Sequence, residues 1–422
     1  MKTLSTLVLS FSLSAFAQSE NIYKLTDVNQ QFFNDNEYAP LAAISNADII
    51  GISESAHNVK DYIKIQTRII QVLVRNYNYR QIYFESSVFK FRPVAQYIQD
   101  GKGDVKTFLK ANFQSRTVQF LDLTEWLRNW NINNPNDRVY IGGVDIYEFQ
   151  VSDPYAVLIK SIENLSTQYQ TDLEIIKQCP AVNLIEDSMI DKFYEDIFSK
   201  AETITDAQYD QCYNQLSLLK DKIKSNVVAE GVLGFNNYYD VILSAQVLMG
   251  IQTYLKKGIV DDNNLHVHVN IRDQLMTDNI INEKLRFGNT QKVIYSAHNV
   301  HTSKATSSIP LWNFMVSPLV STGEHLNKKF IYKNIGSTGY NITGDNKFNI
   351  PTSPLSLDVY MHNLKYETAL IDTNADFIKN QYKWYVHDEN NSDRPDGIFI
   401  QPQKHFDFMY YLDTSVAADK IQ

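Results

Sequence analysis

The chain has 422 residues, of which 44% are hydrophobic, and its formal net charge is -9 at pH 7. That is enough apolar material for the core of one large domain or of two. An acidic chain with no segment dense in Lys and Arg binds nucleic acid poorly, so we expect no nucleic-acid partner.

The first seventeen residues match the three-part pattern of a secretory signal peptide. Lys2 supplies the positive charge, Leu4 to Phe16 is apolar with serines, and Ala15-Phe16-Ala17 is a cleavage site of the A-x-A type. The apolar run is shorter than the ~20 residues that span a bilayer, and no later stretch is long and apolar enough. We therefore predict cleavage after Ala17, no stable membrane insertion, and a periplasmic or secreted protein.

From Asn46 to about Phe149, short runs of β-branched and aromatic residues alternate with longer stretches of helical periodicity. Strands are expected at residues 47–54, 81–85 and 139–145, with helices at 63–73, 93–98 and 120–130 between them. This alternation is typical of parallel strands joined by crossover helices.

Between Pro154 and about Lys257 the strand signals disappear. Amphipathic stretches predict helices at Leu158–Ile176, Met189–Ile204, Gln208–Val227 and Tyr238–Leu255. We interpret this part as a helical insertion that could cap a site, with residues 261–264 as the linker back to the α/β part. A helix at 271–285 and strands at 292–297, 329–335, 368–371 and 397–400 are expected after it.

The predicted fold class is therefore α/β, with a central, mostly parallel sheet flanked by helices and a large helical insertion. The expected divisions are a signal peptide at 1–17, the first part of the α/β catalytic domain at 18–153, the insertion at 154–260, and the second part of the α/β domain at 261–422. The two cysteines, Cys179 and Cys212, both lie in the insertion. Export favours a disulfide between them, and two buried free thiols are the alternative.

Four of the expected strands end on residues capable of acid–base chemistry. These residues are Glu54 and His57, Glu85, Asp145, and finally His298 and His301. Ligands of open α/β sheets bind just beyond the carboxyl ends of the strands. If the four strands are neighbours, the six side chains converge on one crevice and form a candidate active site.

Each of these residues has both a chemical and a structural interpretation. His57 could act as general base, with a carboxylate fixing its tautomer, or it could cap a helix. Glu85, at the rim of the sheet, must be paired, either within a site or with an arginine or a helix end. The two later histidines could stabilise an oxyanion, protonate a leaving oxygen or hold a metal, or bond to backbone carbonyls. Asp145 follows Gly142-Gly143 and could face the crevice or bond to backbone amides.

Two further patterns are weaker. Ser53 lies in a near match to the G-x-S-x-G nucleophile motif, but the last glycine is missing. His266 and His268 alternate as on a short strand, where an exposed polar face is more common than a metal site. No P-loop, dinucleotide-binding, C-x-x-C or H-E-x-x-H motif occurs, so we expect no cofactor and no metal.

At these residues the chain resembles the erythromycin esterase family. The family's first motif, G-E-x-x-H, reads here as residues 53–57, with Ser53 in place of glycine, and Glu85 matches the glutamate that ends the next strand. The other matching segments are Trp126-Leu-Arg128-Asn-Trp-Asn131, Gly143-Val-Asp145, Arg272-Asp-Gln-Leu-Met276, Ala297-His298-Asn299-Val300-His301, Gly323-Glu-His-Leu326 and Asp396-Gly397.

The resemblance implies an α/β fold with a helical insertion and hydrolysis of an ester, which in characterised members is the lactone of a macrolide antibiotic. It implies a catalytic group of His57, Glu54, Glu85, His298 and His301, and substrate-binding or supporting roles for Asp145, Arg68, Arg128 and Arg272. The chain departs from the family at Ser53 and Asn58, where members often have glycine. It departs again at Gln66, where a basic residue is common and Arg68 is the nearest arginine.

The leading hypothesis is thus an exported hydrolase that activates water by a His/Glu site to cleave a small-molecule ester or lactone. A metal-dependent hydrolase that uses the same His/Glu cluster is one alternative. A binding protein that keeps the crevice without turnover is the other.

Overall fold

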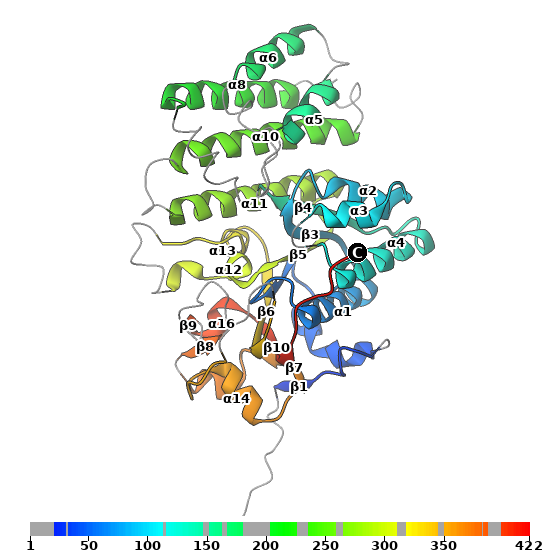
Figure 1. Cartoon of the computed structure of the whole chain (residues 1–422), viewed down its shortest axis with the longest axis vertical. Coiled ribbons are helices and arrows are strands. Elements are labelled where there is room, and N and C mark those ends of the chain that lie inside the picture. Colours follow the sequence, from blue (N-terminus) through cyan, green and yellow to red (C-terminus); the bar gives the residue numbers. More distant parts are fainter. Residues whose placement is uncertain are drawn as a thin grey trace, which may run out of the picture.

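A computed structural model describes residues 21–30, 33–112, 115–146, 152–162, 167–179, 203–225, 235–258, 265–309, 318–344, 350–381, 383–386 and 398–422. The predicted signal peptide, the helix expected at 189–204 except for its last two residues, and the linker at 261–264 lie outside these ranges. Figure 1 shows a mixed sheet in the lower half of the molecule and a stack of helices above it.

In the described part of the chain, eight strands form one sheet in the order β1-β7-β10-β6-β2-β5-β3-β4. The strands from β10 to β4 are all parallel to their neighbours, whereas β7 is antiparallel to β10 and β1 is antiparallel to β7. The fold is therefore α/β with a mostly parallel central sheet, as predicted. The strands are β1 (Ile22–Lys24), β2 (Ile49–Glu54), β3 (Tyr79–Ser87), β4 (Tyr140–Asp145), β5 (Lys292–His298), β6 (Tyr332–Ile342), β7 (Thr368–Asp372) and β10 (Phe408–Ser415).

Both faces of the sheet are covered by helices, which explains the apolar strand sequences. One face packs on α1 (Lys60–Tyr77), α2 (Arg92–Asp100) and α4 (Val118–Asn133) in the largest apolar cluster of the described chain. The other face packs on α11 (Leu265–Phe287) through Tyr83, Met276, Ile280 and Tyr295. The remaining short helices are η1 (Asp35–Ala43), α3 (Val105–Lys110), α12 (Asn299–Thr302), η4 (Thr306–Ser308), α13 (Thr322–Asn327), α14 (Leu357–Asn363), α15 (Asp376–Lys379) and α16 (Pro402–His405).

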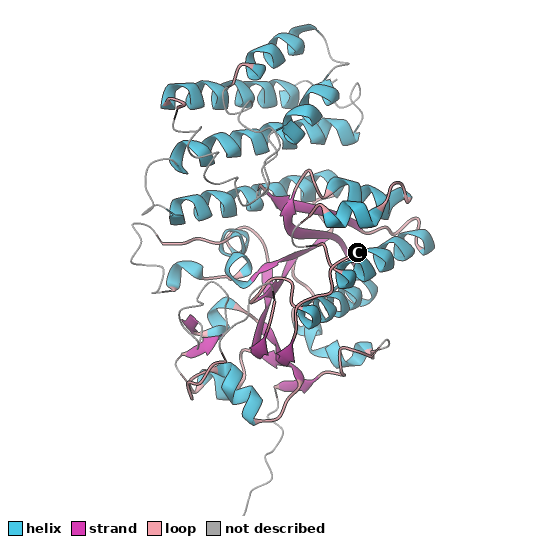
Figure 2. Cartoon of the chain, viewed as in Figure 1, coloured by secondary structure: helices cyan, strands magenta, loops and turns pink. Residues whose placement is uncertain are grey.

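The described residues between β4 and β5 form helices and no strand, as Figure 2 shows. These helices are α5 (Ser152–Ile162), α6 (Thr167–Lys177), α8 (Asp206–Ser225), α10 (Phe235–Gly258) and α11. Helix α10 packs on α5, α8 and α11, so the stack continues down to the helix that covers the sheet. Cys179, just after α6, is joined by a disulfide to Cys212 in α8, with a Cα–Cα distance of 5.5 Å. The predicted disulfide is therefore present.

Several predicted elements differ from the structure. The stretch 158–176 is divided between α5 and α6. The prediction of a strand at His266 and His268 is wrong, because both residues lie near the start of helix α11. Apolar and polar residues alternate over only a few positions here, which is too short a pattern to distinguish a strand from a helix. Strand β10 was not predicted, and neither were β1 and β8 (Trp384–Val386). Strand β9 (Ile398–Ile400), which pairs with β8 in a small two-stranded sheet, matches the strand expected at 397–400.

Strand β6 runs seven residues past the predicted end at Ile335. Its continuation contains Gly336 and Gly339, which suggest a loop in the sequence. A Cβ atom at Gly336 would lie 2.6 Å from the ring of Phe406, so glycine is needed here for close packing. No helix in the described ranges combines the length and the hydropathy needed to cross a membrane.

Candidate active site

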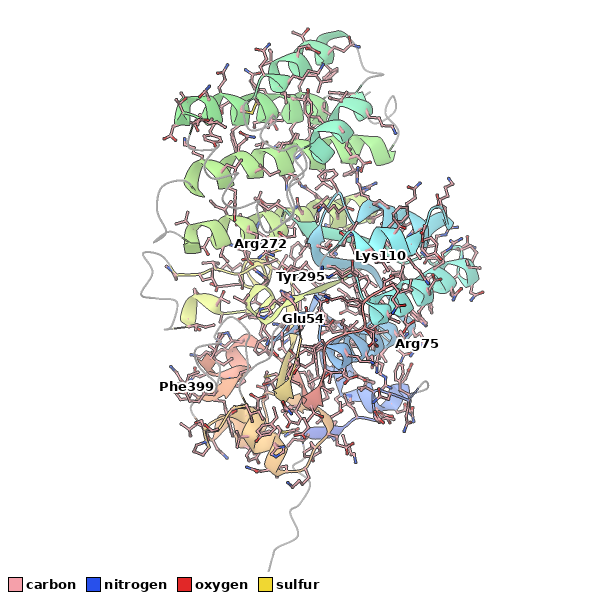
Figure 3. All side chains as sticks on the ribbon, in the orientation of Figure 1. Glu54, Arg75, Lys110, Arg272, Tyr295 and Phe399 are labelled. Carbon is pink, nitrogen blue, oxygen red and sulfur yellow. A yellow bond between two sulfur atoms is a disulfide. The ribbon has the colours of Figure 1, made fainter. Side chains whose placement is uncertain are left out.

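The carboxyl ends of four adjacent parallel strands bring the predicted acid–base residues together. In sheet order, β2 ends at Glu54, β5 ends at His298, β3 carries Glu85 near its end, and β4 ends at Asp145. Glu54 and His298 are direct neighbours in the register of β2 and β5. Figure 3 places Glu54 and Arg272 in the middle of the molecule, where the helical stack meets the sheet.

His57 and Glu54 form the most accessible pair of this group. His57 Nδ1 lies 2.7 Å from Glu54 Oε1, and the side chains are 21% and 14% exposed. An ionised carboxylate can only accept a hydrogen bond, so Nδ1 carries the hydrogen and Nε2 keeps its lone pair. The pair therefore presents a base at Nε2.

The turn that carries His57 explains a departure from the family pattern. Asn58 has a φ of 54°, in the left-handed region that favours glycine, and asparagine is among the few other residues that adopt it readily. Ser53 is fully buried, and its hydroxyl donates to the carbonyl of Ile335 at 3.0 Å. Ser53 thus serves strand packing, in agreement with the weak nucleophile match.

His298 lies beside His57, but its Nδ1 accepts a hydrogen bond where that of His57 donates one. Its Nδ1 accepts the backbone N–H of Val300 at 3.3 Å, which places the hydrogen of the neutral ring on Nε2. The centroids of the two imidazole rings are 5.3 Å apart. The site thus combines an acceptor nitrogen on His57 with a donor nitrogen on His298.

Beneath this pair, Arg272 of α11 bridges two buried carboxylates. Its Nη2 lies 2.6 Å from Glu85 Oε1 and 2.5 Å from Asp145 Oδ2, and its Nε donates to Asp145 at 3.0 Å. The other oxygen of Glu85 accepts the backbone N–H of His298 at 2.8 Å. Both carboxylates are nearly inaccessible to solvent. Arg272 therefore supplies the pairing that buried carboxylates need.

His301 belongs to the same buried group and not to the accessible pair. Its Nε2 lies 3.0 Å from Arg272 Nη1 and 3.3 Å from Glu85 Oε1, and its Nδ1 lies 3.0 Å from both oxygens of Asp273. Burial alone would lower the pKa of His301, but the carboxylates of Asp273 and Glu85 outweigh burial and raise it.

The same charges act on Glu85 in the opposite sense. Burial alone would raise the pKa of Glu85. The charges of His301, Arg272 and His57 outweigh that effect and hold the pKa of this carboxyl well below its ordinary value. Glu85 is thus ionised at neutral pH and acts as a fixed negative charge beneath His57 and His298.

Two arginines that the resemblance linked to the site lie elsewhere. Arg68 donates to the carbonyls of Thr26, Asp27 and Gln30, which holds the N-terminal segment against α1. Arg128 donates to the carbonyl of Gln99 at 3.2 Å, at the C-terminal end of α2. These guanidiniums thus satisfy backbone carbonyls, and no hydrogen bond or ion pair among the described residues joins them to the acid–base cluster. A role for them in the site stays a prediction.

One residue of the cluster was missed in the sequence. Asp273 is fully buried, and its carboxylate accepts from His301 and from the N–H and hydroxyl of Thr322, at 2.7 and 2.8 Å. A charged residue next to Arg272 on a helix gives no signal of its own, since most such pairs face solvent. Among the described residues, no group of three or more His, Cys, Asp or Glu side chains is arranged to hold a metal ion.

The end of the chain braces the turn that carries His57. Residues 416–421 cross the N-terminal ends of α1 and α4, beside the C label in Figure 1. Backbone hydrogen bonds join Ala418 N to Asn58 O at 2.7 Å, Lys60 N to Val416 O at 2.9 Å, and Val118 N to Asp419 O at 2.7 Å. We call residues 416–421 the C-terminal strap.

The family model described as erythromycin esterase matches residues 74–415, so the chain belongs to the erythromycin esterase family. Its members define a class of hydrolases, and this chain is a hydrolase of that family. No curated protein matches the chain.

Three solved structures share the fold across nearly the whole chain. A Bacillus cereus protein has 19% identity and a TM-score of 0.76, over 95% of this chain and 97% of that one. A protein described as a succinoglycan biosynthesis protein has 15% identity and a TM-score of 0.73, over 96% and 97%. A mutant of the erythromycin esterase EreC in its open conformation has 15% identity and a TM-score of 0.70, over 95% and 99%.

Removing the charge of Glu85 should destabilise the fold in a pH-dependent way. Because its folded pKa is lowered, its contribution is present above the unfolded value of about 4.3 and is lost as the pH falls below it. Glu85→Gln should lower the free energy of unfolding by about 3–5 kcal/mol at pH 7, and this difference should shrink towards pH 3. Urea unfolding across this range measures it. Glu174→Gln, on the exposed face of α6, is the control; a pH-independent loss in Glu85→Gln would contradict the assignment.

Deleting residues 416–422 should loosen the His57 turn. Amide hydrogen exchange at 56–60 and 116–118 should speed up at least ~10-fold, because three or more backbone hydrogen bonds are lost, while the interior of α1 stays protected. Asp419→Ala is the matched control, since it removes the side-chain contacts with Lys60 and Gln119 but keeps the strap backbone. Unchanged exchange at 56–60 in the truncated chain would show that the strap does not brace the turn.

Proposed function

We propose that the chain hydrolyses a carboxylic ester or lactone of a small molecule, with His57 as the general base on water. The observation that carries the proposal is the pairing of His57 Nδ1 with Glu54, which directs a basic Nε2 away from its carboxylate partner at the accessible end of the site. Membership of the family supports hydrolysis, and the similarity to EreC is a likeness of fold.

The reaction begins with a water molecule bound to His57 Nε2. The water loses a proton to Nε2 while its oxygen attacks the carbonyl carbon, and Glu54 stabilises the imidazolium that forms. General-base catalysis of this kind contributes roughly 10²–10⁴-fold.

The tetrahedral intermediate then needs a donor for its oxyanion and a proton for its leaving group. We assign the donor role to the Nε2–H of His298, whose ring lies beside that of His57 and is held by its bond to the Val300 N–H. The bond from carbon to the alkoxide oxygen breaks, and the proton passes from His57 Nε2 to that oxygen. The products are the acid and the alcohol, or the opened hydroxy acid of a lactone.

The group of Glu85, Arg272, Asp145, His301 and Asp273 supports this reaction by holding the residues that carry it out. In place of the direct oxyanion role expected for His301, we assign it to the network that holds Glu85 and Arg272. Glu85 in turn holds the backbone of His298 through its N–H. The network thereby fixes the position of the oxyanion donor.

Substitution of His57 tests the proposal. Purified chain is incubated with a panel of macrolides and simple esters, and products that have gained one water are detected by mass spectrometry. Wild type should give such a product, and His57→Ala should lower the rate at least ~10²-fold with the fold intact. His362→Ala is the matched control, because His362 forms an equivalent 2.7 Å pair with Asp413 outside the site. Near-normal turnover by His57→Ala would refute the assignment.

We also propose that the protein is exported, on the basis of the signal pattern at 1–17. The Cys179–Cys212 disulfide supports this, because disulfides persist in oxidising compartments. N-terminal sequencing of protein from the periplasm or medium should begin at Gln18. Recovery only in the cytoplasm with Met1 retained would contradict export.

A further inference from the structure

A small cavity adjoins the site on the face of the sheet covered by α1 and α4. It has a volume of about 40 Å³ and contacts Glu54, the partner of His57. Part of its wall is apolar: Ile63 and Ile70 of α1, Leu123 of α4, and the side chains Phe84, Phe91 and Phe120. Most of the other lining residues are polar and include Gln66 and Glu85. The three phenylalanine rings pack on one another with centroids 5.0–6.0 Å apart. The cavity is therefore an aromatic pocket that opens beside the catalytic pair.

The polar end of this pocket contains a hydroxyl without a partner. Ser115 is 1% exposed, and its Oγ has no hydrogen-bond partner among the described residues. Buried hydroxyls are nearly always satisfied, so an empty space beside one indicates a position that water or a ligand occupies. Apolar cavities, in contrast, stay dry and accept apolar ligands. The pocket thus has a polar part, suited to a water molecule or a polar group, and an aromatic part, suited to an apolar group.

We propose that this pocket binds the acyl chain of the substrate and restricts the enzyme to short aliphatic acyl groups of about four carbons. This inference rests on the proposed hydrolysis. The carbonyl carbon must lie at the water held by His57, and the acyl chain is bonded directly to that carbon. Glu54, which binds His57, lines the pocket, so the pocket lies within reach of the acyl chain. A volume of about 40 Å³ takes about three non-hydrogen atoms beyond the carbonyl.

The walls of the pocket are rigid enough to exclude longer chains. Ile70 and Phe91 are fully buried, and Phe84 and Phe120 are nearly so. On the side of the His57 turn, the C-terminal strap bonds to Asn58 and Arg116, next to the pocket residues Asn58 and Ser115. Close-packed walls of this kind resist expansion, so each additional methylene meets a steric cost.

The first arm of the test measures kcat/KM for 4-nitrophenyl esters from acetate to octanoate. The pocket predicts a maximum at propionate or butyrate and at least a ~10-fold fall by octanoate. Ile70→Ala should move the maximum to longer chains by one or two carbons. Ile69→Ala is the matched control, because Ile69 is equally buried on the same helix but does not line the pocket. It should leave the maximum where it is.

The second arm needs no turnover. The isoleucine δ1 methyl groups of wild type are followed by NMR during titration with butyramide, a neutral analogue of a four-carbon ester. The signals of Ile63 and Ile70 should shift, and those of Ile65 and Ile69 should not. Octanamide should produce no comparable shift of Ile63 and Ile70.

The two arms separate this inference from the proposed function. Hydrolysis with no dependence on chain length, together with unshifted Ile63 and Ile70 signals, would overturn the acyl pocket and leave hydrolysis standing. Absence of turnover with every ester, together with butyramide shifts at Ile63 and Ile70, would overturn hydrolysis and retain an acyl-binding pocket. Failure of both arms would overturn the inference.

Discussion

The guanidinium of Arg272 is the contact on which the arrangement of the site depends. Strands β3 and β4 bring Glu85 and Asp145 to the same buried edge, where two unpaired carboxylates would repel each other and lose their hydration. Arg272 bonds to both, and it comes from α11, the helix that joins the helical stack to the sheet. The Arg272 side chain therefore compensates the charges of the two carboxylates and ties helix α11 to the ends of strands β3 and β4. Truncating it would leave uncompensated buried charge.

This arrangement divides the candidate site into two layers with different tasks. In the lower layer, Glu85, Asp145, His301 and Asp273 are buried, and the Arg272 side chain is 14% exposed. These side chains are paired with one another, so the layer is suited to hold geometry. The upper layer of Glu54, His57 and His298 offers one acceptor nitrogen on the partly exposed His57 and one donor nitrogen on the buried His298. A hydrogen bond from the His298 N–H to Glu85 couples the two layers. Rigid support beneath an accessible base is the arrangement that water activation requires.

The sequence predicts those parts of this structure that depend on local pattern. Short apolar runs that end in Glu54, Asp145 and His298 predict parallel strands whose carboxyl ends meet, and the sheet order brings these ends together. Features that depend on distant packing are not predicted. Asp273 is identified only by its contact with His301. Arg68 and Arg128 match or lie near family motifs, yet the backbone carbonyls that they bind become their neighbours only in the folded chain.

Direct attack of water on the carbonyl, with no covalent intermediate, is the central claim of this account. A single turnover with excess enzyme in H₂¹⁸O, on any ester that the chain hydrolyses, tests it. The account predicts one ¹⁸O atom in the acid product and none in the peptides that contain Glu54 or Glu85. An unlabelled product with ¹⁸O in either glutamate would show that a carboxylate attacked first, and would contradict the assignment of His57 as the base on water.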